Sequence, residues 1–215
     1  MRWHMARKPW TAKGGRRKAI RQLYRHFIFC EDKKSAADYL RAFEVPIEYV
    51  EVIVKGGAGN TDTVVAVALK EREKLIYHRV PYAAIWCVFD RDSFPPQNFN
   101  RAFDLARPFH DVHVIWANEC FELWYLLHFN LRVTPIGRNE LISLLGKPSC
   151  FGKKYQKANK GTFDALKDRL PTAIQNAKTL HSHYGGKPNP ERDNPSTNIH
   201  FLVETLVQLG RLGPV

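Results

Sequence analysis

Two aspartates separated by one residue follow an apolar stretch of strand length. Residues 83–89 read AAIWCVF, and Asp90 and Asp92 come directly after them. Side chains alternate between the faces of a β-strand, so both carboxylates are expected on the same side as the strand ends. Carboxylates a few ångströms apart repel by about 1 kcal/mol in water and more when partly buried, and Mg²⁺ relieves that repulsion. The pattern predicts a divalent-metal site, with a polar strand end and a helix-capping aspartate as the simpler interpretation.

Other carboxylates fall at comparable places in the chain. Glu31 ends the apolar run that begins at His26, and Glu119 and Glu122 follow the run at 111–116. In doubly wound α/β sheets ligands bind at the carboxyl ends of the strands, so these acids are expected near the two aspartates. The two later glutamates would also favour the positive end of a helix dipole, which is their simplest structural interpretation.

The elements that must position these acids alternate along the first 130 residues. Strands are expected at 26–31, 49–54, 83–90 and 111–116, and helices at 35–46, 61–75 and 99–106. The alternation indicates right-handed βαβ crossovers and an α/β fold with a doubly wound, mainly parallel sheet. Ser35 and Asp38 resemble a capping box at the start of the first helix. The glycine-rich loop at 56–60 is expected to be a turn, with phosphate binding as the alternative.

The character of the chain changes after about residue 130, where strand signals fade. Helices are expected at 140–145, 162–180 and 197–209, and a linker or surface loop at 184–196. The predicted organisation has three parts: a basic flexible arm at 1–21, an α/β catalytic core at 22–130, and a helical C-terminal region packed on the core at 131–215.

Charge points to a polyanionic partner. The chain has 33 Lys and Arg against 21 Asp and Glu, a formal net charge of +12, which favours nucleic acid. Candidate phosphate-binding residues lie in the N-terminal arm, beside Glu31 and in the glycine-bounded segment 152–161: Arg16, Arg17, Lys33, Lys34, Lys153, Lys154, Lys157 and Lys160. A solvated tail and an ordinary surface loop are the alternative interpretations.

Cysteine spacing and hydropathy indicate the cellular compartment in which the protein is found. Cys30, Cys87, Cys120 and Cys150 form no CxxC pair, which fits free thiols in a reducing environment; a four-cysteine zinc site has no support in the spacing. No apolar run reaches the length of a membrane span, and the N-terminus lacks a signal-peptide core. We therefore expect a cytoplasmic protein with no membrane partner, and leave a partner protein or a homo-oligomer open.

A glutamate ending the first strand, followed by a DxD ending a later strand, resembles the signature of the Toprim fold of topoisomerases, primases and several nucleases. Four sequence segments give a closer resemblance to RloB-like proteins: FCEDKKSAADYL at 29–40, VFDRD at 88–92, CFELWYLLHF at 120–129 and NPSTNIH at 194–200. The resemblance covers roughly residues 24–210. The chain departs from the family pattern at Asp32, where the family usually has Gly, and at Glu119, where it usually has Pro.

This resemblance implies a Toprim-like, divalent-metal-dependent nuclease linked with restriction and phage-defence loci. Glu31, Asp90 and Asp92 would bind Mg²⁺ or Mn²⁺, and Glu31 could instead act as a general base or acid. Glu122 would complete the catalytic set. Supporting residues around these acids would be Asn118, Glu119 and His128.

Two other classes of function remain as alternatives. A different DxD-metal enzyme, such as a nucleotide-sugar transferase or a phosphohydrolase, would not need the basic arm and does not account for Glu31. A phosphatase of the haloacid-dehalogenase type would normally carry its DxD on the first strand, unlike this chain. A non-catalytic nucleic-acid-binding module would not need the acids at all.

Overall fold

The computed structural model describes residues 24–31, 34–46, 49–54, 61–92, 96–157 and 161–211. Five strands form one sheet in the order β2-β1-β3-β4-β5. They are β1 (Arg25–Cys30), β2 (Val50–Val54), β3 (Tyr82–Asp90), β4 (Val112–Asn118) and β5 (Ser196–Thr197). The first four are parallel and β5 runs antiparallel to β4. The predicted α/β class with a mainly parallel sheet is confirmed.

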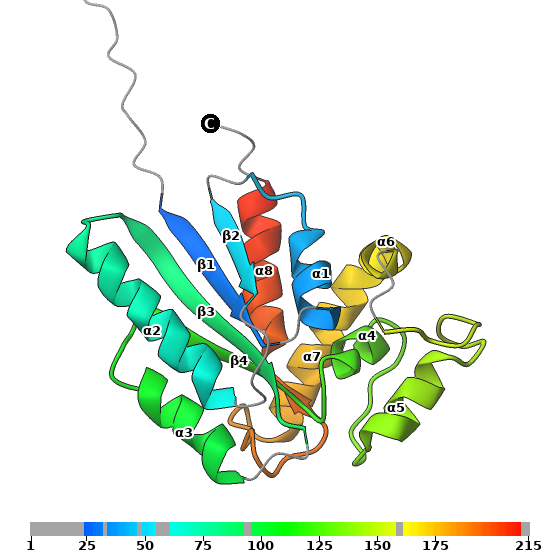
Figure 1. Cartoon of the computed structure of the whole chain (residues 1–215). Helices are drawn as coiled ribbons and strands as arrows, with labels where there is room; N and C mark the ends of the chain where they lie inside the picture. Colours follow the sequence, from blue (N-terminus) through cyan, green and yellow to red (C-terminus); the bar gives the residue numbers. More distant parts are fainter. Residues whose placement is uncertain are drawn as a thin grey trace, which may run out of the picture.

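Helices cover both faces of this sheet. In Figure 1, α2 and α3 lie on one side of the strands and α1 and α8 on the other, the doubly wound arrangement that was predicted. The α-helices are α1 (Ser35–Arg41), α2 (Thr61–Tyr77), α3 (Pro96–Ala106), α4 (Glu122–Leu127), α5 (Arg138–Leu145), α6 (Thr162–Leu166), α7 (Leu170–His183) and α8 (Ile199–Gly210).

The central strand β3 explains why both faces need a cover. Its side chains alternate between two apolar clusters, and every residue from 84 to 89 is buried. Ala84, Trp86 and Val88 belong to the cluster that includes α1, α4, α7 and α8. Ile85, Cys87 and Phe89 belong to the cluster that includes α2 and α3. A strand that is apolar on both faces is typical of a covered parallel sheet.

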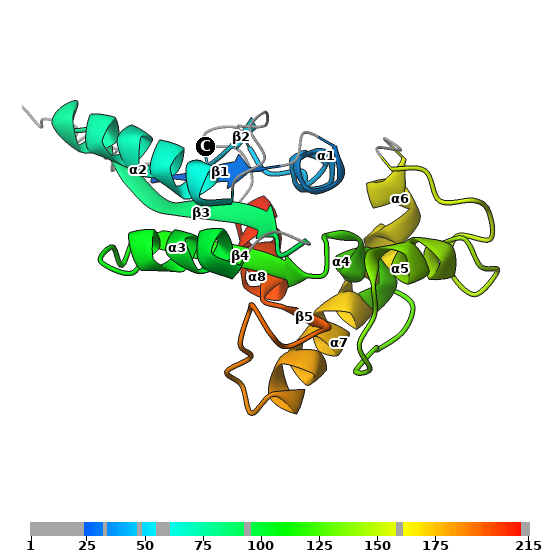
Figure 2. The same cartoon turned by 60° about the horizontal axis from the view of Figure 1, so that its bottom comes forward.

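The helices that follow β4 pack together beside the sheet. Helix α4 contacts α5 and α7, and α7 contacts α8 (Figure 2). Buried side chains such as Trp124 and Leu141 join these helices to the cluster under α1. The predicted division at residue 131 stays a prediction. The segment 184–196, expected as a linker or loop, ends in the first residue of β5, which pairs with the end of β4.

One predicted helix, over 162–180, is wrong as a continuous element. The structure has α6, then a 3₁₀ turn at Lys167–Arg169, then α7. Pro171 lies in the first turn of α7, where its missing N–H leaves no helical hydrogen bond unmade. In the interior of one long helix the same proline would remove such a bond and clash with the preceding turn.

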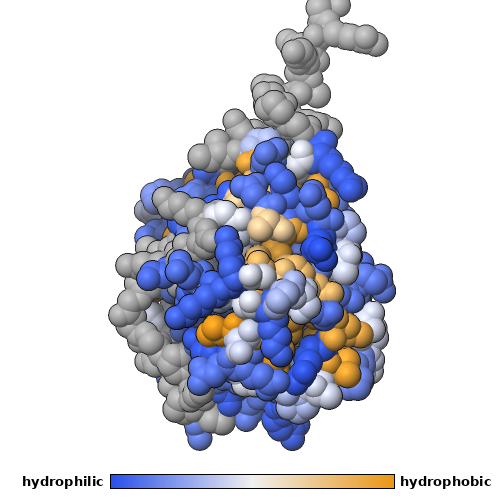
Figure 3. Space-filling view, turned by 90° about the vertical axis from the view of Figure 1, so that its right-hand side faces the viewer, coloured by the Kyte–Doolittle hydropathy of each residue, from blue (hydrophilic) through white to orange (hydrophobic). Residues whose placement is uncertain are grey.

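The surface on the side of α5 and α6 is mainly hydrophilic around a central apolar area (Figure 3). None of the helices in the described ranges is long and apolar enough to cross a membrane.

Two buried histidines should make the fold sensitive to acid. Burial lowers the pKa of His128 and of His200 from 6.5 to about 4. Between those pH values the unfolded chain binds more protons than the folded chain, so stability falls as pH falls through that window. Each histidine should contribute about 1.4 kcal/mol per pH unit. Urea unfolding between pH 7 and pH 4 measures this slope.

The matched variants for this measurement are His200→Gln and the exposed-site variant His183→Gln. The first should flatten the dependence of unfolding free energy on pH, and the second should leave it unchanged. Equal slopes for both variants and the parent protein would show that other groups cause the acid sensitivity.

Candidate active site

The end of β3 carries the two aspartates. Asp90 is the last residue of the strand, and its side chain is 14% exposed. Asp92 has a φ of 42°, in the left-handed region, so the strand geometry ends between the two residues. The Asp92 N–H donates to the Glu119 carbonyl oxygen at 3.0 Å, which ties this turn to the chain that follows β4. A turn, rather than the strand alternation expected from the sequence, sets the direction of the second carboxylate.

Arg138, the first residue of α5, pairs with both aspartates. Its Nη2 lies 3.6 Å from Asp90 Oδ2 and also forms an ion pair with Asp92 Oδ1. The sequence analysis did not identify this residue, because Arg138 is far from both aspartates in the chain and no motif distinguishes it among the 33 lysines and arginines. The DxD sequence therefore already has a cationic side chain beside it.

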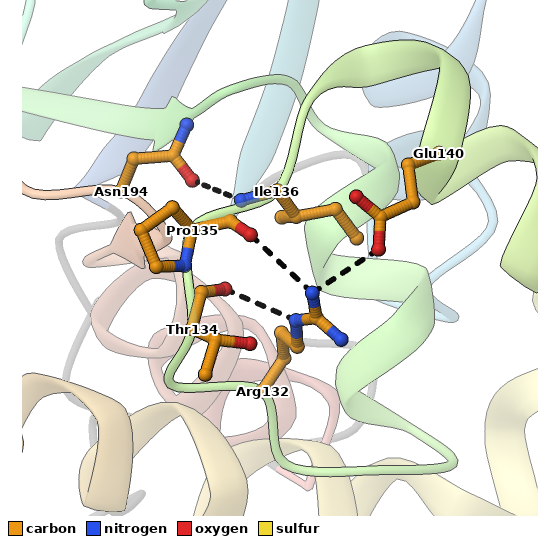
Figure 4. Close-up of polar contacts among 6 residues, drawn as sticks. All are labelled: Arg132, Thr134, Pro135, Ile136, Glu140 and Asn194. Carbon is orange, nitrogen blue, oxygen red and sulfur yellow. Dashed lines mark hydrogen bonds and ion pairs between the residues drawn. The ribbon is translucent and has the colours of Figure 1, made fainter.

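A set of hydrogen bonds holds the segment that leads into α5 (Figure 4). The Arg132 guanidinium donates to the Thr134 carbonyl oxygen at 3.0 Å, the Pro135 carbonyl oxygen at 3.3 Å and the Glu140 carboxylate at 3.1 Å. Asn194 Oδ1 accepts the Ile136 N–H at 2.9 Å, joining this segment to the residues just before β5. These bonds fix the turn before Arg138 and so the place from which its side chain reaches the aspartates.

Glu122 begins α4 and is 1% exposed. Its Oε1 accepts hydrogen bonds from Ser35 Oγ at 2.9 Å and from the Tyr155 hydroxyl at 3.2 Å. The predicted capping role of Ser35 is wrong: Ser35 lies inside α1, whose N-cap is Lys34, and its hydroxyl serves Glu122 instead. Tyr155, from the basic segment, is a second site residue that the sequence analysis missed.

The electrostatics of the site centre on Asp90. Burial and the nearby Glu122 carboxylate raise the pKa of Asp90 to about 8, with a smaller contribution from Glu31, while Arg138 and Lys157 oppose the rise. A carboxyl whose ionisation is disfavoured by burial and by like charges is typical of functional sites. A further cation would offset the repulsion between these carboxyl groups.

Glu31 directly follows β1, the strand beside β3. Its N–H donates to the Val88 carbonyl oxygen at 3.0 Å, which extends the β1–β3 pairing by one residue, and its side chain is half-buried. Glu31 also acts electrostatically on Asp90. Acids from the ends of β1 and β3 and from the start of α4 therefore influence one another, although they are far apart in the chain.

The carboxylates fit a divalent cation in donor chemistry and charge. Carboxylate oxygens are the ligands that Mg²⁺ prefers, and they also suit Mn²⁺. In the described part of the chain, no three His, Cys, Asp or Glu side chains already form a group that could hold a metal ion. The residues that could hold one are Asp90 and Asp92, which now share Arg138, with Glu31 on the adjacent strand. All four cysteines are free thiols.

The supporting residues expected from the sequence have other contacts. The His128 ring nitrogens lie 3.1 Å from the Tyr39 hydroxyl and 2.9 Å from the Trp124 carbonyl oxygen, so both are engaged within the core between α1 and α4. Asn118 Nδ2 donates to the carbonyl oxygens of Pro190 and Glu191 and anchors the segment before β5. Glu119 contributes its carbonyl oxygen to Asp92.

The candidate phosphate-binding residues are placed only in part. Lys153 and Lys154 are exposed and line a pocket of about 200 Å³ together with Tyr155 and Thr162. Lys157 is exposed and acts electrostatically on Asp90. Lys34 lies at the N-terminus of α1. The others lie outside the described residues: Arg16, Arg17, Lys33 and Lys160.

Comparison with known proteins adds one finding. A sequence model described as RloB-like protein matches residues 26–206. The matched span is most of the chain and contains Glu31, Asp90, Asp92, Glu122 and Arg138. No curated protein and no solved structure matches the chain.

Proposed function

The chain belongs to the RloB-like protein family, and from this membership and its cluster of acids we propose that it is a divalent-metal-dependent nuclease. The acids around Asp90 carry the proposal: Glu122 and Glu31 disfavour its ionisation, and Arg138 pairs with both Asp90 and Asp92. The net charge of +12 fits a nucleic-acid substrate. The family resemblance supports a Toprim-type reaction and a role in anti-phage defence.

Each acid has a distinct proposed role. Asp90 and Asp92 hold Mg²⁺ or Mn²⁺, which would stabilise the attacking and leaving oxygens of the phosphodiester. Glu31 takes or supplies a proton, or adds a ligand oxygen, from the adjacent strand. Glu122 is buried and accepts bonds from Ser35 and Tyr155, which hold its carboxyl group in place near Asp90, where it would orient the cluster.

Arg138 is proposed to exchange partners when metal binds. With the aspartates occupied as ligands, its guanidinium would be released toward the substrate, where it suits a phosphate group. The exposed lysines 153, 154 and 157 extend this positive surface along the segment that carries Tyr155. These side chains would contact backbone phosphates, which do not distinguish one base sequence from another.

Cleavage of defined substrates tests the proposal. The purified protein is incubated with transfer RNA, single-stranded RNA, plasmid DNA and single-stranded DNA, in Mg²⁺, Mn²⁺ or EDTA. We expect cleavage of at least one nucleic acid in a divalent metal and none in EDTA. Hydrolysis of small phosphoesters or nucleotide sugars instead would favour another DxD enzyme, and binding without any reaction would favour a nucleic-acid-binding module.

The salt dependence of binding tests the basic surface. Replacing Lys153, Lys154 and Lys157 by Ala should flatten the plot of log affinity against log salt by about 0.7–0.9 per lost phosphate contact. Deleting residues 1–21 should flatten it separately without moving the cleavage position. Filter binding at several salt concentrations measures both slopes. If either slope matches that of the parent protein, the corresponding segment does not contact phosphate.

A further inference from the structure

Some backbone N–H and C=O groups of β4 point to the outer edge of this strand, the edge away from β3. The Asp111 and Ala117 carbonyl oxygens face β3, accepting the N–H groups of Ile85 and Arg91. In a parallel pair, alternate residues direct their backbone groups to the same neighbour. Residues 112, 114 and 116 therefore direct their N–H and C=O groups away from β3, toward the outer edge.

One end of this edge is occupied by side chains that take the place of a strand. Asn198 Oδ1 accepts the Trp116 N–H at 2.9 Å, and Asn198 Nδ2 donates to the Val114 carbonyl oxygen at 2.8 Å. Thr197 Oγ1 donates to the Trp116 carbonyl oxygen at 2.7 Å. Among the described residues, the Val114 N–H and the Val112 carbonyl oxygen have no hydrogen-bond partner.

An apolar groove lined by residues of β4 and by residues near α3 and α8 runs along this edge. Figure 2 shows where these two helices lie relative to β4. The volume of the groove is about 740 Å³, and its lining comes from both faces of the sheet. Phe103 and Phe109 line it on the α3 side, and Trp86 and Phe201 line it on the α8 side. Phe201 is 49% exposed, although it is a large apolar residue. The groove therefore offers side-chain contacts on either side of a strand laid along β4.

The groove lining contains basic side chains. Arg107, His110 and His113 line it, and none of the described residues in its lining is acidic. Burial lowers the pKa of His113, and Arg107 is exposed at the groove and pairs with Asp104. A second copy of this chain would bring the same basic groups against them, on a protein with a net charge of +12. An occupant with acidic side chains would be attracted instead.

We propose that the edge of β4 binds an extended segment of a partner protein in which acidic and apolar residues alternate. The segment adds to the sheet as a sixth strand parallel to β4. In a parallel pair, a residue on one strand bonds to two residues of the other strand that lie two positions apart. The N–H of a partner residue opposite His113 would therefore donate to the Val112 carbonyl oxygen, and its carbonyl oxygen would accept the Val114 N–H. Successive side chains of a strand point to opposite faces, so the apolar ones would contact Trp86 and Phe201 on the α8 side, and the acidic ones would lie on the α3 side with Arg107. This inference does not depend on the proposed nuclease activity.

A labelled peptide tests the proposal. The probe is an acetylated and amidated peptide that alternates Glu and Val over eight residues, and its binding to the full chain is followed by fluorescence anisotropy. Two comparison probes carry Lys in place of Glu, or Gly in place of Val. We expect the Glu-Val peptide to bind at least tenfold more tightly than either comparison probe. Equal binding of all three, or no binding, would overturn the proposal.

Two variants locate the site. Phe201→Glu places a negative charge in the groove, and Val114→Pro removes the outward N–H at a strand edge, where proline is tolerated. Each should weaken peptide binding at least tenfold. Tyr77→Glu is the control, because Tyr77 is 82% exposed on α2 and does not line the groove. Circular dichroism melting establishes that each variant is folded, and Phe201→Glu decides the result if Val114→Pro does not fold.

Hydrogen exchange gives an independent measurement on the parent protein. Adding the Glu-Val peptide should slow exchange of the Val114 amide, the outward N–H of β4 that gains a partner. Unchanged exchange there despite peptide binding would place the peptide elsewhere. Displacement of the peptide by a single-stranded oligonucleotide, with the same dependence on Phe201→Glu, would assign the groove to nucleic acid and overturn the proposal.

Discussion

Asp92→Asn protein is expected to fold and to bind nucleic acid like the parent protein, and to lose metal-dependent cleavage by about three orders of magnitude or more. The substitution preserves the size of the side chain and removes the charge that would hold a divalent cation. Nucleic-acid affinity rests on the basic surface and does not need that carboxylate. Single-turnover cleavage rates and filter binding, measured on the same preparation, separate the two effects.

Three further variants calibrate this result. Glu31→Gln should lower the cleavage rate as much as Asp92→Asn does. Glu122→Gln should lower it by about 10–100-fold if Glu122 only supports the groups that contact the metal. Asp164→Asn is the matched control, because Asp164 is 73% exposed and pairs only with Lys167 among the described residues. Parent-like cleavage by both Asp92→Asn and Glu31→Gln would remove these acids from the reaction.

Arg138→Gln protein is expected to be less stable than the parent protein without metal and to recover when divalent metal is added. The substitution removes the cation that Asp90 and Asp92 share, and so removes positive charge from beside two neighbouring carboxyl groups. Breaking a buried ion pair costs several kcal/mol, but the Arg138 side chain is 35% exposed, so we expect a loss of roughly 1–3 kcal/mol. Urea unfolding in EDTA measures the loss of stability, and urea unfolding in Mg²⁺ or Mn²⁺ measures its recovery.

The recovery is the informative part, because a bound metal stabilises only the folded state. Arg107→Gln is the control, since Arg107 is 76% exposed and its ion pair is with Asp104, away from the acids. Its stability should respond to metal as the parent protein does. Equal stability of Arg138→Gln and the parent in EDTA, or a loss that metal does not reverse, would contradict the exchange of Arg138 for metal.

Much of the fold could be predicted because the strands carry their own signals. The run at 83–89 is apolar at every position, and the structure buries it between two helical layers. The alternation of strands and helices indicated the parallel sheet. The short strand β5 was missed, since two residues carry no periodic pattern, and it forms through pairing with β4 and the bonds of Thr197 and Asn198.

The candidate site could be predicted only where a residue is marked by its place on an element. Glu31 and Asp90 end strands, so their positions at one end of the sheet follow from a parallel arrangement. Arg138 and Tyr155 are not marked in this way, because tertiary packing alone brings them to Asp90 and Glu122. Ser35 was assigned to helix capping, since the local pattern does not reveal a partner 87 residues away.

The most direct test of the central claim is to locate manganese in crystals of the protein soaked in Mn²⁺, by its anomalous scattering. The account predicts a peak at coordination distance from the carboxylates of Asp90 and Asp92, with the Arg138 guanidinium displaced from them, and no such peak in Asp92→Asn crystals treated identically. A fully soaked crystal with no anomalous peak at these aspartates, or with Arg138 still paired to both, would contradict it.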